Sequence, residues 1–122
     1  MSNPLYSELV LQHAANPRNL GDLAGATATV SATNPVCGDE MTLAVRMNDG
    51  HVAEAKFKAR GCKAAVASAS LLTEMMVGKT LAELREITAE QISQALGGLP
   101  SATRHGSQLA EDALDAILER LG

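Results

Sequence analysis

Aromatic side chains are almost absent from this 122-residue chain, which contains one Phe, one Tyr and no Trp. Basic charge is also scarce, because ten Lys and Arg side chains stand against fourteen Asp and Glu, for a formal net charge of −4. A protein that binds nucleic acid needs positive charge for the phosphates and commonly uses aromatic rings to stack on bases. The composition therefore argues against nucleic acid as a partner.

Long hydrophobic runs are missing as well. The N-terminal stretch MSNPLYSELVLQHAANPRNLG has no apolar segment long enough for a signal peptide or a membrane span, so we expect a cytoplasmic protein with no membrane partner. Only two cysteines are present, Cys37 and Cys62. A single domain over residues 1–122 is large enough to fold without a disulfide. In a reducing compartment both cysteines should be thiols, available as metal ligands or nucleophiles.

Hydrophobic periodicity predicts an α+β fold. Strand patterns occupy three segments, residues 26–33, 40–47 and 51–59. Asn-Asp-Gly at 48–50 predicts a tight hairpin between the last two. Helical patterns occupy four segments, residues 3–14, 62–78, 88–96 and 107–122, the third with a Thr and a Gln at capping-box spacing. A group of strands followed mostly by helices is typical of α+β proteins.

The stretch NPVCGDE, residues 34–40, gives Cys37 an unusual setting for a packed core residue. Pro35 and Gly38 flank it, and both residue types mark backbone at the surface. Asp39 follows directly, either as a functional carboxylate or as the residue that shapes a turn. The segment leaves Cys37 open as a nucleophile or as a metal ligand.

The second cysteine, Cys62, follows Gly61 where a predicted strand passes into a predicted helix. At a helix N-terminus the unpaired backbone N–H groups favour a thiolate, so we expect a lowered pKa for Cys62, helped by the neighbouring Lys63. His105 lies in LPSATRHGS, a predicted loop before the last helix. Together Cys37, Asp39, Cys62 and His105 are a sufficient ligand set for a tetrahedral metal site. The other two histidines, His13 and His51, are assigned no function.

Four segments of the chain resemble a known family. In order and spacing, YSELVLQHAANPRNLG, NPVCGDEMTLAV, FKARGCKAAVASASLLTEMMVGKT and SQLAEDALDAI are similar to the U-type scaffold proteins of iron-sulfur cluster assembly: IscU, SufU and the amino-terminal part of NifU. The resemblance covers nearly the whole chain and implies a compact fold with a three-stranded antiparallel sheet packed against helices. It implies that the protein accepts sulfur from a cysteine desulfurase, assembles a [2Fe-2S] or related cluster and passes it to recipient apo-proteins. Many members also bind zinc at the same site.

Not every functional residue of the family has a counterpart in this sequence. Cys37, Asp39, Cys62 and His105 match the family's cofactor ligands, but Gly106 stands where the family has a third cysteine, so that the motif is HGS instead of HCS. The Pro-Val-Lys segment that recruits a chaperone is replaced by Ser-Ala-Thr, so the resemblance does not extend to chaperone docking. Two thiolates, an imidazole and a carboxylate suit zinc or iron and would hold a [2Fe-2S] cluster only weakly.

Three functions remain open from the sequence. The first is a scaffold or carrier that is not an enzyme, with Cys37 or Cys62 as sulfur acceptor. The second is a regulator or sulfur acceptor that binds the desulfurase without building a stable cluster, which the missing third cysteine favours. The third is a thiol hydrolase that would use one of the two cysteines with His105 and Asp39.

Overall fold

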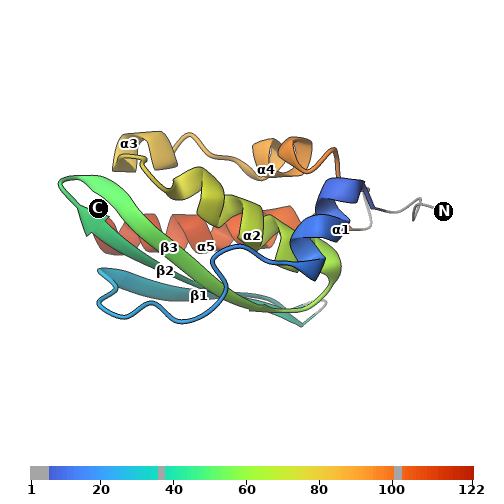
Figure 1. The fold of residues 1–122 in the computed structure, drawn as a ribbon, viewed down its shortest axis with the longest axis horizontal. Coiled ribbons are helices and arrows are strands. Elements are labelled where there is room, and N and C mark those ends of the chain that lie inside the picture. Colours follow the sequence, from blue (N-terminus) through green and yellow to red (C-terminus); the bar gives the residue numbers. More distant parts are fainter. Residues whose placement is uncertain (1–5, 36–37, 101–102) are drawn as a thin grey trace.

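A three-stranded antiparallel sheet, covered on one face by helices, forms the protein (Figure 1). The computed structural model describes residues 6–35, 38–100 and 103–122. The strands lie in the order of the chain and are β1 (Ala28–Asn34), β2 (Asp39–Asn48) and β3 (His51–Arg60). This arrangement confirms the predicted α+β class and, within one or two residues at each end, the three predicted strands.

The predicted hairpin joins β2 to β3. Asn48 pairs with His51, and the two residues between them, Asp49 and Gly50, both have positive φ, at 53° and 80°. A two-residue turn of this kind matches the right-handed twist of the strands, and it favours the Asp-Gly pair found here. The hairpin fixes which side chains of β2 and β3 face the helices: Met41, Leu43, Val45, Ala55 and Phe57 are all at most 1% exposed.

Five helices complete the described part of the chain: α1 (Glu8–Ala15), α2 (Lys63–Met76), α3 (Leu81–Leu84), α4 (Ala89–Ala95) and α5 (His105–Leu121). Helix α2 packs over β3 and α5 packs over β1, and the core lies between these two helices and the sheet. The buried face of α2 is built from Ala and Ser, which lets it approach its neighbours closely. None of the helices in the described ranges combines the length and apolarity that a bilayer crossing requires.

Capping interactions set helix boundaries that the hydrophobic pattern did not locate. Helix α1 begins at Glu8, later than predicted, because the Ser7 hydroxyl accepts a hydrogen bond from the Val10 backbone N–H; residues 3–5 lie outside the described ranges. Helix α3 was not predicted, although Thr80 and Glu83 form a capping box around its single turn. The capping box predicted for α4 is confirmed.

The last helix begins two residues before its predicted start. Helix α5 already includes His105 and Gly106, so the prediction that His105 lies in a loop was wrong. The backbone N–H of Gln108 donates to the carbonyl of Arg104, which makes these residues part of the first helical turn. His105 is therefore held by a helix of 17 residues instead of a loop.

His13 joins α1 to α2 inside the protein. The residue is 7% exposed, and its Nδ1 lies 2.7 Å from the Ser70 hydroxyl. The same hydroxyl oxygen accepts a hydrogen bond from the backbone N–H of Arg18. The Nε2 of His13 lies 3.6 Å from a carboxylate oxygen of Glu74. Burial, and to a smaller extent Arg18, lowers the pKa of His13 below its ordinary value, against the opposing effect of Glu74.

We expect the free energy of unfolding to decrease as the pH falls from about 7.5 to 5.5. Because the pKa of His13 is lower in the folded state, the unfolded chain binds more protons here, and stability is lost as the pH falls through the unfolded value of about 6.5. Urea unfolding at several pH values measures this. His13→Gln removes the titration and can still accept from Ser70, so its pH slope should be smaller. An equal slope in both proteins would contradict the assignment.

Candidate functional site

Three elements bring Asp39, Cys62 and His105 to one end of the sheet. Asp39 is the first residue of β2, and Cys62 is the N-cap of α2, two residues beyond the end of β3. Since β2 and β3 are antiparallel neighbours, with Glu40 opposite Arg60, the start of one lies beside the end of the other. His105 opens α5, whose first turn packs against the first turn of α2. Residues far apart in the sequence thus meet through strand pairing and helix packing.

The three side chains form a compact triangle of ligand atoms. Cys62 Sγ lies 3.6 Å from Asp39 Oδ2 and 3.5 Å from His105 Nε2, and the latter two atoms are 3.4 Å apart. Ligands about 2.0–2.3 Å from a tetrahedral zinc ion lie about 3.3–3.8 Å from one another. The triangle therefore has the dimensions of one face of a tetrahedral metal site.

The same geometry does not suit a thiol hydrolase. In a catalytic triad, one ring nitrogen of the histidine faces the nucleophile and the other faces the carboxylate that orients the ring. Here Nε2 of His105 is the atom that faces both the Cys62 thiol and the Asp39 carboxylate. Side chains whose donor atoms converge on one point in this way are typical of a metal site.

The Cys62 thiol has a raised pKa, so the expectation of a lowered one was wrong. Burial raises the pKa of Cys62 most, and the charge of Asp39 raises it further. The backbone N–H groups of Ala64 and Ala65 act in the expected direction, but they do not outweigh burial. In the metal-free protein the thiol form is thus favoured, and a bound cation is what would stabilise the thiolate.

Gly61 makes room for the Asp39 carboxylate. A Cβ atom at this position would lie 2.5 Å from the Asp39 Cγ, and the backbone has a φ of 152°, which side chains rarely adopt. Asp39 is only 5% exposed, so its carboxylate would have to shift within a packed environment to avoid that Cβ. The Gly-Cys pair therefore places a candidate ligand at its second residue and leaves space for another candidate ligand at its first.

Gly61→Ala should lower metal affinity by about tenfold or more, since groups that orient a metal ligand typically contribute 10–100-fold. The matched control is Gly21→Ala, which introduces a Cβ at a φ of 127° with no atom within 4 Å. In an Asp39→Ala background, Gly61→Ala should cause no further loss, because no carboxylate remains to be displaced. Additive losses, measured by competition with a chromogenic chelator, would contradict this role.

Gly106 is not a gap in the ligand set. A Cβ at this position would lie 2.7 Å from the carbonyl carbon of Ala64 and 2.8 Å from the backbone nitrogen of Ala65. The backbone of α2 occupies the space that a side chain at 106 would need. The residue is helical and buried, and it does not have the positive φ that would mark a special loop conformation. Its role is close contact between the first turns of α2 and α5.

The structure unites three of the four predicted ligands. The fourth, Cys37, lies outside the described residues. His13 and His51 are remote from the triangle, the first bonded to Ser70 and the second beside the hairpin turn. Sequence reasoning missed the spatial roles of Gly61 and Gly106. The signal was present, because each glycine directly adjoins a predicted ligand.

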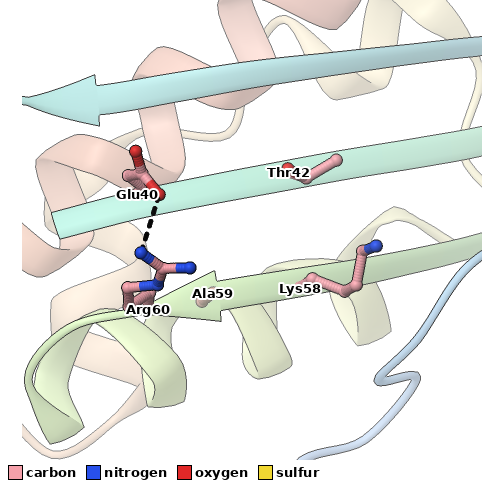
Figure 2. A pocket seen from close by; sticks show the side chains of 5 residues that line it. All are labelled: Glu40, Thr42, Lys58, Ala59 and Arg60. Carbon is pink, nitrogen blue, oxygen red and sulfur yellow. Dashed lines mark ion pairs between the residues drawn. The ribbon is translucent and has the colours of Figure 1, made fainter.

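A separate hollow lies on the outer face of the sheet, where β2 and β3 run side by side (Figure 2). Arg60 and Glu40 border it and form an ion pair at 4.0 Å, with side chains 86% and 56% exposed. An exposed pair of this kind contributes little to stability, and the residues that line the hollow include no cysteine or histidine. This surface is therefore not a candidate site.

Comparison with known proteins gives consistent family matches. The model of the NifU-like N-terminal domain matches residues 5–120. The iron-sulfur cluster assembly scaffold protein IscU of Azotobacter vinelandii is 45% identical over 119 residues, with 93% of this chain and 91% of the relative covered. IscU 1 of Archaeoglobus fulgidus, which has the same scaffold description, is 44% identical over 110 residues, with 90% and 72% covered.

Solved structures show the same fold. A crystal structure described as an iron-sulfur cluster assembly scaffold of the SUF system from Fervidobacterium islandicum has a TM-score of 0.76 at 22% identity, with 97% of this chain and 99% of that chain covered. The N-terminal part of a NifU-like protein from Brucella abortus has a TM-score of 0.65 at 24% identity, with 95% and 82% covered. Both likenesses concern the fold.

Proposed function

Because this chain belongs to the NifU-like N-terminal domain family, we propose that it is a scaffold or carrier protein of iron-sulfur cluster assembly. The observation that supports the proposal most directly is the triangle of Asp39, Cys62 and His105, which has the spacing of metal ligands. Relatives at 44–45% identity are named as assembly scaffolds. Thiol ligands require a reducing compartment, which is why we place this function in the cytoplasm.

We propose Cys37 as the fourth ligand. Its Cα is two residues from that of Asp39 and so lies at most about 7 Å from it. Asn34 pairs with Asp39 across the strands, which ties both ends of the segment containing Cys37 to the sheet beside the triangle. Two thiolates, one imidazole and one carboxylate would then surround the metal.

This ligand set favours a single zinc or iron ion over a durable [2Fe-2S] cluster. Zinc accepts sulfur, nitrogen and oxygen ligands in a tetrahedron, whereas iron-sulfur clusters are held mostly by thiolates. The buried backbone contact at Gly106 closes the position where a third thiolate would stand. We therefore expect any cluster on this protein to be short-lived and quickly transferred to recipient apo-proteins.

Sulfur transfer needs no third cysteine. A thiolate of Cys37 or Cys62 can attack the outer sulfur of the desulfurase's cysteine persulfide, forming a new S–S bond while the desulfurase thiolate leaves. No oxidant or reductant is consumed. The closed position at Gly106 also favours a second function, a desulfurase-binding regulator or sulfur acceptor that builds no cluster of its own.

Metal analysis and a visible spectrum of protein isolated without oxygen test the proposal. We expect about one zinc or iron ion per chain, and a coloured cluster only transiently after reconstitution with desulfurase, iron and cysteine. Cluster transfer to an apo-ferredoxin supports the scaffold, whereas desulfurase binding without any cluster supports the regulator. Absence of both metal and desulfurase binding would remove the two functions together.

A further inference from the structure

The outer edge of β1 is an open edge of the sheet. In the described ranges, β1 pairs with β2 alone. The opposite edge, on β3, is partly covered by isolated bridges from Leu20 to Phe57 and from Thr80 to His51. An open edge presents backbone N–H and C=O groups that can pair with another extended segment.

Strand β1 also lacks the features that usually protect an edge. Its sequence, ATVSATN, has no charged residue and no proline. Val30 and Ala32, on the face toward the helices, are only half-buried, whereas the corresponding side chains of β2 are fully buried. One more strand beside β1 would cover them.

Helix α5 forms a second wall along this edge. A hollow of about 220 Å³ lies between the end of β1, at Thr33, and the N-terminal half of α5, at His105 and Asp112. Another, of about 410 Å³, lies between Val30 and the end of α5, at Ala116 and Glu119. Since β1 and α5 run in opposite directions, the two hollows follow one seam, which we call the β1–α5 groove.

The helical wall of the groove is acidic. Asp112 and Glu119 line it and are exposed, and Asp115 lies one helical turn from each. Burial raises the pKa of Asp115 most, and the charges of Glu111, Asp112 and Glu119 raise it further. One basic side chain, Arg120, also lines the groove. The strand adds no charge, so the groove is net negative.

We propose that the β1–α5 groove binds an extended, basic segment of a partner protein as a fourth strand of the sheet. Backbone pairing to β1 would supply affinity. Lysine side chains on the helix-facing side of the new strand would cover the half-buried apolar residues of β1 with their aliphatic stems, and their charged ends would reach Asp112 and Glu119 and supply selectivity. A second copy of this chain fits less well, because a two-fold contact would place the acidic wall against itself. The groove ends at His105, so the bound segment would reach the metal ligands.

A fluorescein-labelled peptide of alternating valine and lysine is the probe, and its binding is followed by anisotropy at low salt. The same peptide with glutamate in place of lysine should not bind. Asp112→Asn with Glu119→Gln should weaken binding about five- to tenfold, the effect of losing two exposed charge contacts. Glu86→Gln with Glu90→Gln changes the net charge equally on another surface and should leave binding unchanged. Equal effects of the two double variants would overturn the proposal.

Hydrogen-deuterium exchange shows whether the peptide adds a strand. Amides of residues 28–33 should exchange more slowly when the peptide is bound, because pairing protects the outward-facing N–H groups of β1. Peptide binding without such protection would overturn the proposal. So would a dimer, found by light scattering without peptide, in which β1 is already protected, because the occupant would then be a second copy.

Discussion

Gly106→Cys should destabilise the protein and weaken metal binding instead of adding a third thiolate. The new Cβ would overlap the backbone of Ala64 and Ala65, which cannot rotate away as a side chain can. Overpacking of this kind typically costs about 1–3 kcal/mol. To relieve it, α5 must move away from α2, and His105, one residue earlier in the same turn, must move with it.

Gly106→Ala is the control that separates the clash from the chemistry of the thiol. In a helix, alanine is normally more stabilising than glycine by about 0.5–1 kcal/mol, so a loss of stability in this variant must come from the Cβ contact. We expect Ala and Cys to destabilise by similar amounts in urea unfolding. Zinc affinity should fall in both variants, because the ligand triangle is disturbed in both.

The opposite result would reveal a scaffold that can still accept its third ligand. A Gly106→Cys protein as stable as the parent, with a longer-lived cluster after reconstitution, would show that α2 and α5 separate easily. The contact at Gly106 would then have no influence on which cofactor is held. If Gly106→Cys is instead unstable but binds the desulfurase as the parent does, the result would support a site specialised for a single metal ion or for sulfur transfer.

Removing Cys62 should abolish tight metal binding. Cys62 supplies the sulfur atom of the triangle, and its loss leaves only an imidazole and a carboxylate among the described ligands. Changing a group that merely orients a ligand costs 10–100-fold in affinity, so we expect loss of this ligand in Cys62→Ala to cost more than about 100-fold. Chelator competition measures the affinity, and circular dichroism checks that the fold is retained.

The other ligands have matched controls within the chain. His105→Gln should weaken zinc binding strongly, whereas His51→Gln, at the exposed hairpin turn, should not. Asp39→Asn should likewise weaken binding, whereas Asp49→Asn should not. Equal affinities within either pair of variants would show that the triangle is not the metal site.

Cys37→Ala tests the proposed fourth ligand separately. If Cys37 completes the tetrahedron, its loss should resemble that of Cys62 and should shift the thiolate-to-metal absorption of the cobalt-substituted protein toward a single-thiolate spectrum. An unchanged cobalt spectrum would mean that the fourth position is filled by water or by a partner's ligand. The three-ligand triangle would remain valid in that case.

The sequence alone determined the three strands, the hairpin that joins two of them and the residue types of the candidate ligands. Alternation in residues 40–47 and 51–59 with Asn-Asp-Gly between them specified the hairpin, because strand periodicity and turn preference are local properties. The residue types at Asp39, Cys62 and His105 indicated a metal site before their positions were known. Local patterns also predicted the α+β class, because strand and helix periodicities can be told apart along the chain.

Tertiary structure alone decided how these residues work together. Whether Gly106 leaves a gap or fills one depends on how closely α5 approaches the backbone of Ala64, some 40 residues away in sequence. The raised pKa of Cys62 follows from burial and from Asp39, which outweigh the local effect of the helix N-terminus. Such quantities depend on distances between segments remote in the chain, and packing sets those distances whereas local sequence patterns do not.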